Sequence, residues 1–371
     1  MDLSRCSCDK AGFCPVFRRD MDSKNHHWCK STTKEKRIRY YEQNVGIYKE
    51  NLLEEISNTF AFPKRYNVPV NMDEVEIITF HFNASKSKRL VETYYEFNFF
   101  LRNLKDYVTC YEIVFDDRQP EIKNSKVINA TLQKNCMWQK ESLMNIGIKE
   151  AKKKGKKYII WVDHDLVFSN PNWLVECVNN LKNGFNFIQP FNKVNYLDKE
   201  LKKVFIISKG RVYIKKTKDN NSSRNVKGAP GAVWASRVED LDKIMPLPNS
   251  FLGSGDEFLA QGLFQDEDWE NHSHHFNYEK RVEQMIERHI RRTQSYNFKV
   301  GYIDNICYHL WHGDFSNRQY TTRYDIVKKY NVDVINDLFV NNDGLLEFVD
   351  SKSEEFSKAL LNYFVSRKED G

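Results

Sequence analysis

Apolar runs of strand length alternate along the chain with segments whose apolar residues have helical spacing. Val75–Phe82 and Tyr111–Phe115 are predicted strands, whereas Lys88–Leu104, Gln139–Lys154 and Pro171–Leu181 show the periodicity of helices with one buried face. This β-α-β-α order predicts an α/β fold with a doubly wound, mixed but mainly parallel sheet that is flanked by helices.

One apolar run leads directly into two aspartates. Tyr158–Val162 has the Ile, Tyr, Trp and Val content of a strand buried on both faces, and Asp163, His164 and Asp165 follow it. Ligands of open α/β sheets bind at the carboxyl ends of strands. Because residues two apart on a strand project to the same side, we expect both carboxylates to bind one Mg²⁺ or Mn²⁺ ion against a diphosphate. A lone D-x-D more often only opens a turn, so this prediction depends on the rest of the chain.

Two later segments combine glycines with small or acidic residues. Residues 228–237 (Gly-Ala-Pro-Gly-Ala-Val-Trp-Ala-Ser-Arg) are small enough for the backbone to approach a ligand closely, although a tight turn into a strand needs the same composition. Residues 251–259 contain Asp256 and Glu257 on a glycine turn that opens a helix. Acids at a helix start are often only caps.

A third segment offers nitrogen ligands and cationic side chains. His309 and His312 follow a short apolar run, and Arg318 and Arg323 come soon afterwards. The histidines are candidates for a metal ligand and the arginines for a phosphate clamp. A buried histidine with a hydrogen-bond partner is the simpler alternative.

In this order, the motifs resemble those of GT-A glycosyltransferases, specifically the metal-dependent inverting enzymes of family 2 and the β-1,4-galactosyltransferase-like group. The resemblance covers about Val75 to Tyr330 and implies a Rossmann-like nucleotide-diphospho-sugar transferase fold. It departs from the galactosyltransferase pattern at Ser254, where that group has glycine, and no tryptophan precedes this position. The donor sugar and the acceptor are therefore not implied.

The resemblance also implies roles for individual residues on the donor side. Asp163 and Asp165 match the D-x-D motif, with Asp165 the more direct metal ligand, and His309 or His312 matches the histidine that completes the metal site. Gly231 and Ala232 match the segment that forms the floor of the donor-sugar site.

On the acceptor side, Asp256 and Glu257 match the acidic pair that carries the catalytic base, and we favour Asp256. Asp117, at the end of the second strand, matches a position that contacts the nucleotide base or ribose. Arg318 or Arg323 is expected to help to hold the pyrophosphate.

The predicted reaction is the metal-dependent transfer of a sugar from a UDP- or GDP-sugar to the hydroxyl group of a glycan or another acceptor, with inversion. Mn²⁺ or Mg²⁺ is the expected cofactor. One alternative is another metal-dependent nucleotidyl or phosphoryl transferase or phosphoesterase, which should lack the glycine floor. A second is a zinc-knuckle protein that binds nucleic acid, but the core offers no base-reading elements, so no nucleic acid partner is expected.

Half of the eight cysteines lie near the N-terminus. Cys6, Cys8, Cys14 and Cys29 are candidate ligands of a structural zinc ion, although their spacing is not that of a standard zinc finger. An iron–sulfur cluster, disulfides and free thiols remain alternatives. The other cysteines lie singly in apolar surroundings and are predicted core residues: Cys110, Cys136, Cys177 and Cys307.

Length and composition set the domain organisation. A chain of 371 residues exceeds the ~250–300 residues of a single core, and 40% hydrophobic residues are ample for a packed interior. No apolar run approaches the ~18 residues of a membrane span, and Met1–Arg5 lack the apolar core of a secretory signal, so we expect a cytoplasmic protein. The net charge of +6 suits anionic substrates without selecting one. The predicted parts are a Cys-rich module (1–31), a charged helical arm (32–70), the GT-A domain (71–345) and a C-terminal helix (346–371).

Overall fold

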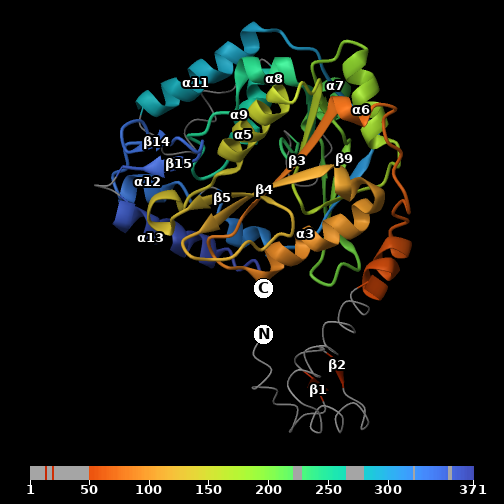
Figure 1. Cartoon of the computed structure of the whole chain (residues 1–371), viewed down its shortest axis with the longest axis horizontal. Coiled ribbons are helices and arrows are strands. Elements are labelled where there is room, and N and C mark those ends of the chain that lie inside the picture. The colour runs from red at the N-terminus through yellow and green to blue at the C-terminus, as the bar shows by residue number, and fades with distance from the viewer. Residues whose placement is uncertain are drawn as a thin grey trace. The chain divides into compact units, whose positions relative to one another are not determined.

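The computed structural model describes residues 13–14, 19–20, 50–219, 228–264, 280–320, 322–349 and 353–371 (Figure 1). The chain forms two compact units, residues 1–60 and residues 61–371. In the first unit, β1 (Phe13–Cys14) pairs antiparallel with β2 (Arg19–Asp20), and residues 50–59 are helical. Cys6, Cys8 and Cys29 lie outside the described residues, so the predicted zinc site stays a prediction.

The second unit is built on a seven-stranded sheet with the strand order β12-β8-β11-β6-β3-β4-β5. Only β11 runs antiparallel to its neighbours, so the sheet is mixed and mainly parallel, as predicted. In sheet order the strands are β12 (Val300–Tyr302), β8 (Phe187–Gln189), β11 (Val233–Arg237), β6 (Tyr158–Val162), β3 (Val75–Phe82), β4 (Val108–Phe115) and β5 (Lys126–Ala130).

The composition of β6 follows from burial on both of its faces. All five of its residues are buried. Ile159 and Trp161 belong to one hydrophobic core, whereas Tyr158, Ile160 and Val162 belong to another on the opposite face. Alternate side chains of a strand point to opposite faces, so a strand with core on both sides needs an uninterrupted apolar run.

Helices supply the rest of both cores. Residues of α5, α8, α9 and α11 pack in the first core, and residues of α3 and α6 pack in the second (Figure 1). The α5 face that the sequence predicted, Met144, Ile148 and Ala151, is buried. The helices are α3 (Lys88–Leu101), α4 (Leu132–Asn135), α5 (Lys140–Lys153), α6 (Trp173–Lys182), α7 (Arg211–Thr217), α8 (Val238–Ile244), α9 (Gly255–Phe264), α11 (Lys280–Ser295), α12 (Asp325–Lys329) and α13 (Ser353–Ser366), with short 3₁₀ helices η2 (Met72–Glu74), η3 (Arg102–Tyr107) and η4 (Phe315–Arg318).

A second, four-stranded sheet has the order β10-β9-β13-β7. Its strands are β10 (Val204–Lys209), β9 (Lys193–Leu197), β13 (Ile306–His309) and β7 (Leu166–Phe168). Since β6 belongs to the large sheet and β7 to this one, residues 163–165 form the link between the two sheets. The predicted D-x-D therefore lies where the chain changes sheets.

The C-terminal region differs from the prediction of a helix over 346–371. β14 (Leu338–Val340) and β15 (Leu346–Phe348) form an antiparallel pair, and the helix that follows, α13, ends at Ser366. Residues 367–371 continue past this helix, and Arg367 and Glu369 are buried.

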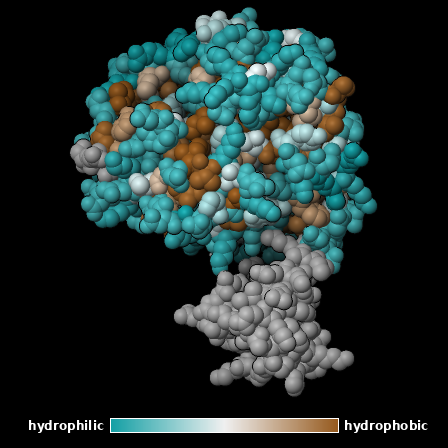
Figure 2. All heavy atoms as spheres, viewed as in Figure 1, coloured by the Kyte–Doolittle hydropathy of each residue, from teal (hydrophilic) through white to brown (hydrophobic). Residues whose placement is uncertain are grey.

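The four cysteines predicted to lie in the core do so. Cys110, Cys136, Cys177 and Cys307 are buried and free, as expected of core residues. Figure 2 shows a largely hydrophilic face on which hydrophobic residues appear in separate patches. No helix within the described ranges has the length and apolar content needed to cross a membrane.

Candidate functional site

Strand pairing brings the predicted motifs together around residues 163–165. β11 pairs antiparallel with β6, which places the segment preceding Val233 beside the end of β6, and the Asp163 N–H donates to the Ala232 carbonyl at 2.9 Å. β13 pairs antiparallel with β7, and the Leu310 N–H donates to the Asp165 carbonyl at 2.7 Å. The glycine-rich segment and the histidine segment therefore flank the D-x-D from opposite sides.

Asp165, His309 and His312 form a group whose ligand atoms lie within 4.8 Å of one another. Asp165 Oδ2 is 2.9 Å from His312 Nε2 and 3.4 Å from His309 Nε2. The other carboxylate oxygen, Oδ1, is buried and has no hydrogen-bond partner among the described residues. A buried oxygen without a partner beside two converging imidazole nitrogens fits a bound divalent cation.

The two histidines differ in the groups behind their rings. His309 Nδ1 is 2.7 Å from the Leu310 carbonyl oxygen, which can only accept a hydrogen bond, so Nδ1–H is the donor and Nε2 carries the lone pair. His312 Nδ1 faces Glu369 Oε1 at 3.6 Å. A carbonyl oxygen placed like that of Leu310 fixes the tautomer of a metal-binding histidine, whereas Glu369 is too far from His312 Nδ1 for a hydrogen bond and acts on it through its charge. The chain past α13 thus contributes to this site.

Burial sets the protonation of the group. It lowers the pKa of His309 to about 3, so the ring is neutral at physiological pH. Burial disfavours the ionised form of Asp165, but His309 and His312 outweigh this effect and hold the pKa of the carboxyl below its usual range. A neutral imidazole and an ionised carboxylate are the forms that bind cations.

Asp163 does not join this group. Its Oδ1 is instead 2.8 Å from the Nζ of Lys140, the first residue of α5. The expectation that both aspartates converge on one cation assumed strand geometry, whereas residues 163–165 form the turn between β6 and β7. The two carboxylates therefore have different partners.

The acidic pair lies at the start of α9, as predicted, and its two carboxylates differ in environment. Asp256 Oδ2 accepts a hydrogen bond from the same Lys140 Nζ at 2.9 Å. Glu257 accepts from Arg211 at 2.7 Å through Oε2 and from Gln261 at 3.0 Å through Oε1. Both oxygens of Glu257 are thus engaged, which favours Asp256 as the group that meets a substrate.

The glycine turns make room for carboxyl groups. A Cβ atom on Gly231 would lie 2.5 Å from Asp256 Oδ2, and one on Gly255 would lie 2.0 Å from Glu141 Oε1. The space beside Gly255 is therefore filled by Glu141. Ala232 and Ser254 have φ values of +79° and +80°, so both keep the backbone conformation that glycine favours.

The remaining predicted residues have different surroundings. Arg318 Nη2 is 3.0 Å from His312 Nε2 and so belongs to the site. Arg323 instead donates to Ser254 Oγ at 2.8 Å, beneath the turn that precedes Asp256. Asp117 is exposed directly after β4.

Four residues in or beside the site were not predicted: Lys140, Glu141, Arg211 and Glu369. Lys140 and Glu141 are buried at the start of α5, and Arg211 is 1% exposed in α7. The sequence around them does not indicate a functional role, because lysine and glutamate at the start of an amphipathic helix are ordinarily solvated. Only their burial distinguishes them.

A second cluster of potential ligands has a simpler explanation. His81, Glu112 and Glu121 also bring ligand atoms within 4.8 Å of one another. However, His81 Nε2 bonds Glu121 at 2.8 Å, and Glu112 accepts from the backbone N–H groups of Glu121 and Ile122. These contacts satisfy the cluster without an ion, and they anchor the loop after β4.

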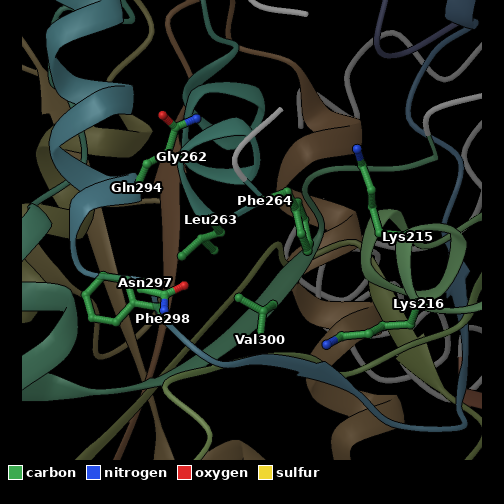
Figure 3. Close-up of a pocket in the computed structure, with 9 residues that line it drawn as sticks. All are labelled: Lys215, Lys216, Gly262, Leu263, Phe264, Gln294, Asn297, Phe298 and Val300. Carbon is green, nitrogen blue, oxygen red and sulfur yellow. The ribbon is translucent and has the colours of Figure 1, made fainter. Parts of the chain in front are cut away.

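A cavity of 320 Å³ lies at the far end of α9 from Asp256 (Figure 3). Since a ten-residue helix is ~15 Å long, the cavity is separate from Asp256. It is lined by Lys215, Lys216, Gly262, Leu263, Phe264, Gln294, Asn297, Phe298 and Val300.

No protein-family model matches the chain, and no curated protein matches it in sequence. Mannose-1-phosphate geranyltransferase from Thermus thermophilus aligns over 64% of this chain and 74% of its own, with 10% identity and a TM-score of 0.25. The glycosyltransferase GlyE of Streptococcus pneumoniae aligns over 81% of this chain and 61% of its own, with 12% identity and a TM-score of 0.25. At such TM-scores the alignments carry no argument about activity.

Proposed function

We propose that this protein is a metal-dependent glycosyltransferase that moves a sugar from a nucleoside-diphosphate donor to an acceptor hydroxyl with inversion. The observation that supports this best is the group formed by Asp165, His309 and His312, with the buried and unpartnered Oδ1 of Asp165. It lies at the carboxyl end of the β6 strand, where α/β sheets bind their ligands, and next to a separate acidic group at Asp256.

Asp165, His309 and His312 would hold the cation. When bound, Mn²⁺ or Mg²⁺ supplies positive charge for the diphosphate leaving group. A set with two imidazoles suits Mn²⁺ better than Mg²⁺, because Mg²⁺ prefers an all-oxygen shell. Arg318, which is next to His312, is placed to add a guanidinium to the same diphosphate.

Asp256 would take the proton of the acceptor hydroxyl as that oxygen attacks the anomeric carbon. Its side chain is 26% exposed, so an acceptor can reach it, whereas Glu257 is bound by Arg211 and Gln261. The C–O bond to the diphosphate breaks as the new glycosidic bond forms on the opposite face of the sugar. Asp117, exposed after β4, is the candidate contact for the nucleoside of a UDP- or GDP-sugar.

A phosphoesterase or nucleotidyltransferase is the second candidate, because two histidines and a carboxylate also suit phosphoryl chemistry. The two candidates differ in which bond breaks. Sugar transfer releases an intact nucleoside diphosphate, whereas cleavage within the diphosphate gives a nucleoside monophosphate and a sugar phosphate.

A thermal-shift screen of nucleotide sugars, each with and without Mn²⁺, tests the proposal. We expect at least one UDP- or GDP-sugar to raise the unfolding temperature only when Mn²⁺ is present. Chromatography of the products then distinguishes the released nucleoside diphosphate from the monophosphate. A metal-independent response would contradict the metal dependence, and release of the monophosphate would contradict sugar transfer.

A further inference from the structure

Lys140 lies at a position where a positive charge is unfavourable. It is the first residue of α5, where the helix dipole disfavours cations, and it is 5% exposed, so its ammonium has lost most of its hydration. Two carboxylates offset these costs, Asp163 at 2.8 Å and Asp256 at 2.9 Å. The site, rather than the helix, therefore accounts for a lysine at this position.

The ammonium fixes one oxygen of Asp256 and leaves the other accessible. Oδ2 bonds Lys140 and packs against Gly231, where a Cβ atom would approach it to 2.5 Å. No described group hydrogen-bonds Oδ1, and the side chain is 26% exposed. Held in this way, the carboxylate presents Oδ1 as the atom that can accept a proton.

The same ammonium determines where Asp163 points. Asp163 is two residues from Asp165, yet its carboxylate bonds Lys140 and lies outside the group formed by Asp165, His309 and His312. Asp165 of the D-x-D therefore lies in the candidate cation site, whereas Lys140 keeps Asp163 beside the candidate base, Asp256.

We propose that Lys140 is a positioning residue for the transfer reaction, orienting Asp256 for proton removal and holding Asp163 away from the cation. The first half of this inference, the orientation of Asp256, rests on the proposed function. The second half, the position of Asp163, concerns metal binding alone. Each half therefore has its own experiment.

Mn²⁺ binding to the full chain, followed by the electron paramagnetic resonance signal of free Mn²⁺, tests the second half without any substrate. We expect Asp165→Asn to weaken Mn²⁺ binding by more than ~10-fold and Asp163→Asn to change it by less than ~3-fold, because only Asp165 is a ligand. Comparable weakening in both variants would show that Asp163 binds the cation and would overturn this half.

Turnover of the nucleotide sugar found in the screen tests the first half. We expect Lys140→Met to lower kcat ~10²-fold with the donor KM within ~3-fold, since a misplaced base affects the chemical step rather than donor binding. In an Asp256→Asn background, the same substitution should cost less than ~3-fold, because both changes act through one carboxylate. Losses that multiply would overturn the assignment. Lys152→Met, on the exposed part of α5, is the matched control.

Lys140→Met leaves two half-buried carboxylates without their cation, which by itself destabilises the fold. The double variant Lys140→Met/Asp163→Asn keeps only the carboxylate of Asp256. Its transfer rate is compared with that of Asp163→Asn alone. We expect the double variant to fold and to remain ~10²-fold slower than Asp163→Asn. Equal rates would mean that Lys140 only balances charge. Absence of any metal-dependent transfer by the natural chain would instead remove the proposed function, while the Mn²⁺ experiment still decides whether Asp163 binds the cation.

Discussion

Glu141 gives the most quantitative prediction, because it is a buried acid that the proposed reaction does not use. It is 4% exposed in the first turn of α5, and its Oε2 has no hydrogen-bond partner among the described residues. Burial raises the pKa of Glu141 from its ordinary value of 4.5 to about 8, and the nearby Asp256 carboxylate adds to this effect while Lys140 opposes it. The folded protein therefore keeps Glu141 neutral at pH 7.

The sign of the pH dependence follows from proton counting. Between pH 4.5 and 8 the folded state binds a proton at Glu141 and the unfolded state does not, so the free energy of unfolding falls as pH rises. At about 1.4 kcal/mol per pH unit, the free energy of unfolding is lower by about 3 kcal/mol at pH 7 because of Glu141. Glu141→Gln removes the ionisable group without changing its size, so its stability relative to the natural chain should rise by about 3 kcal/mol from pH 4.5 to pH 7.

Urea unfolding followed by tryptophan fluorescence, at pH 5 and pH 7.5, measures this difference. Asp163, whose pKa burial raises to about 6, titrates in the same window, but it does so in both proteins. Glu150→Gln is the control, because Glu150 is only partly buried on the same helix and its hydrogen bond with Lys126 lowers its pKa. The same stability difference at both pH values would refute the argument and show that Glu141 is ionised in the fold.

Three further predictions concern the site. Glu369→Gln should weaken Mn²⁺ binding by up to ~10-fold, because a negative charge 3.6 Å from His312 Nδ1 is lost; unchanged affinity would exclude Glu369 from that role. Ala232→Gly should raise the free energy of unfolding by ~1 kcal/mol in urea, because alanine is strained at a φ of +79°; a loss of stability would show that the methyl group packs favourably. Asp256→Asn should keep metal-dependent donor binding but lose transfer by ~10²–10⁴-fold, and loss only in Glu257→Gln would reverse the two roles.

Local periodicity accounts for the part of the fold that could be predicted. β3, α3, β4, α5, β6 and α6 each bury a face or both faces against a core, so the apolar spacing of each reveals its type. β5 (Lys126–Ala130) was missed because it is an edge strand with no fully buried residue. The antiparallel insertion of β11 and the whole second sheet depend on pairing between distant segments, which spacing alone does not encode.

The same distinction applies to the site. Motif order in the sequence located the D-x-D, the glycine segment, the acidic pair and the histidines, because each lies next to a strand or helix end. Which carboxylate faces which partner depends on the turn over residues 163–165, where the two-residue repeat of a strand no longer holds.

Lys140 shows that burial can identify a site residue that the sequence does not reveal. It is one of 57 lysines and arginines, and the start of an amphipathic helix gives no reason to distinguish it from the solvated lysines of the same helix. What separates it is the convergence of Asp163 from the end of β6 and Asp256 from the start of α9, two elements distant in sequence. A buried cation remains charged only where such partners meet it. A fully buried lysine between two carboxylates is therefore better evidence for a working site than any of the three residues alone.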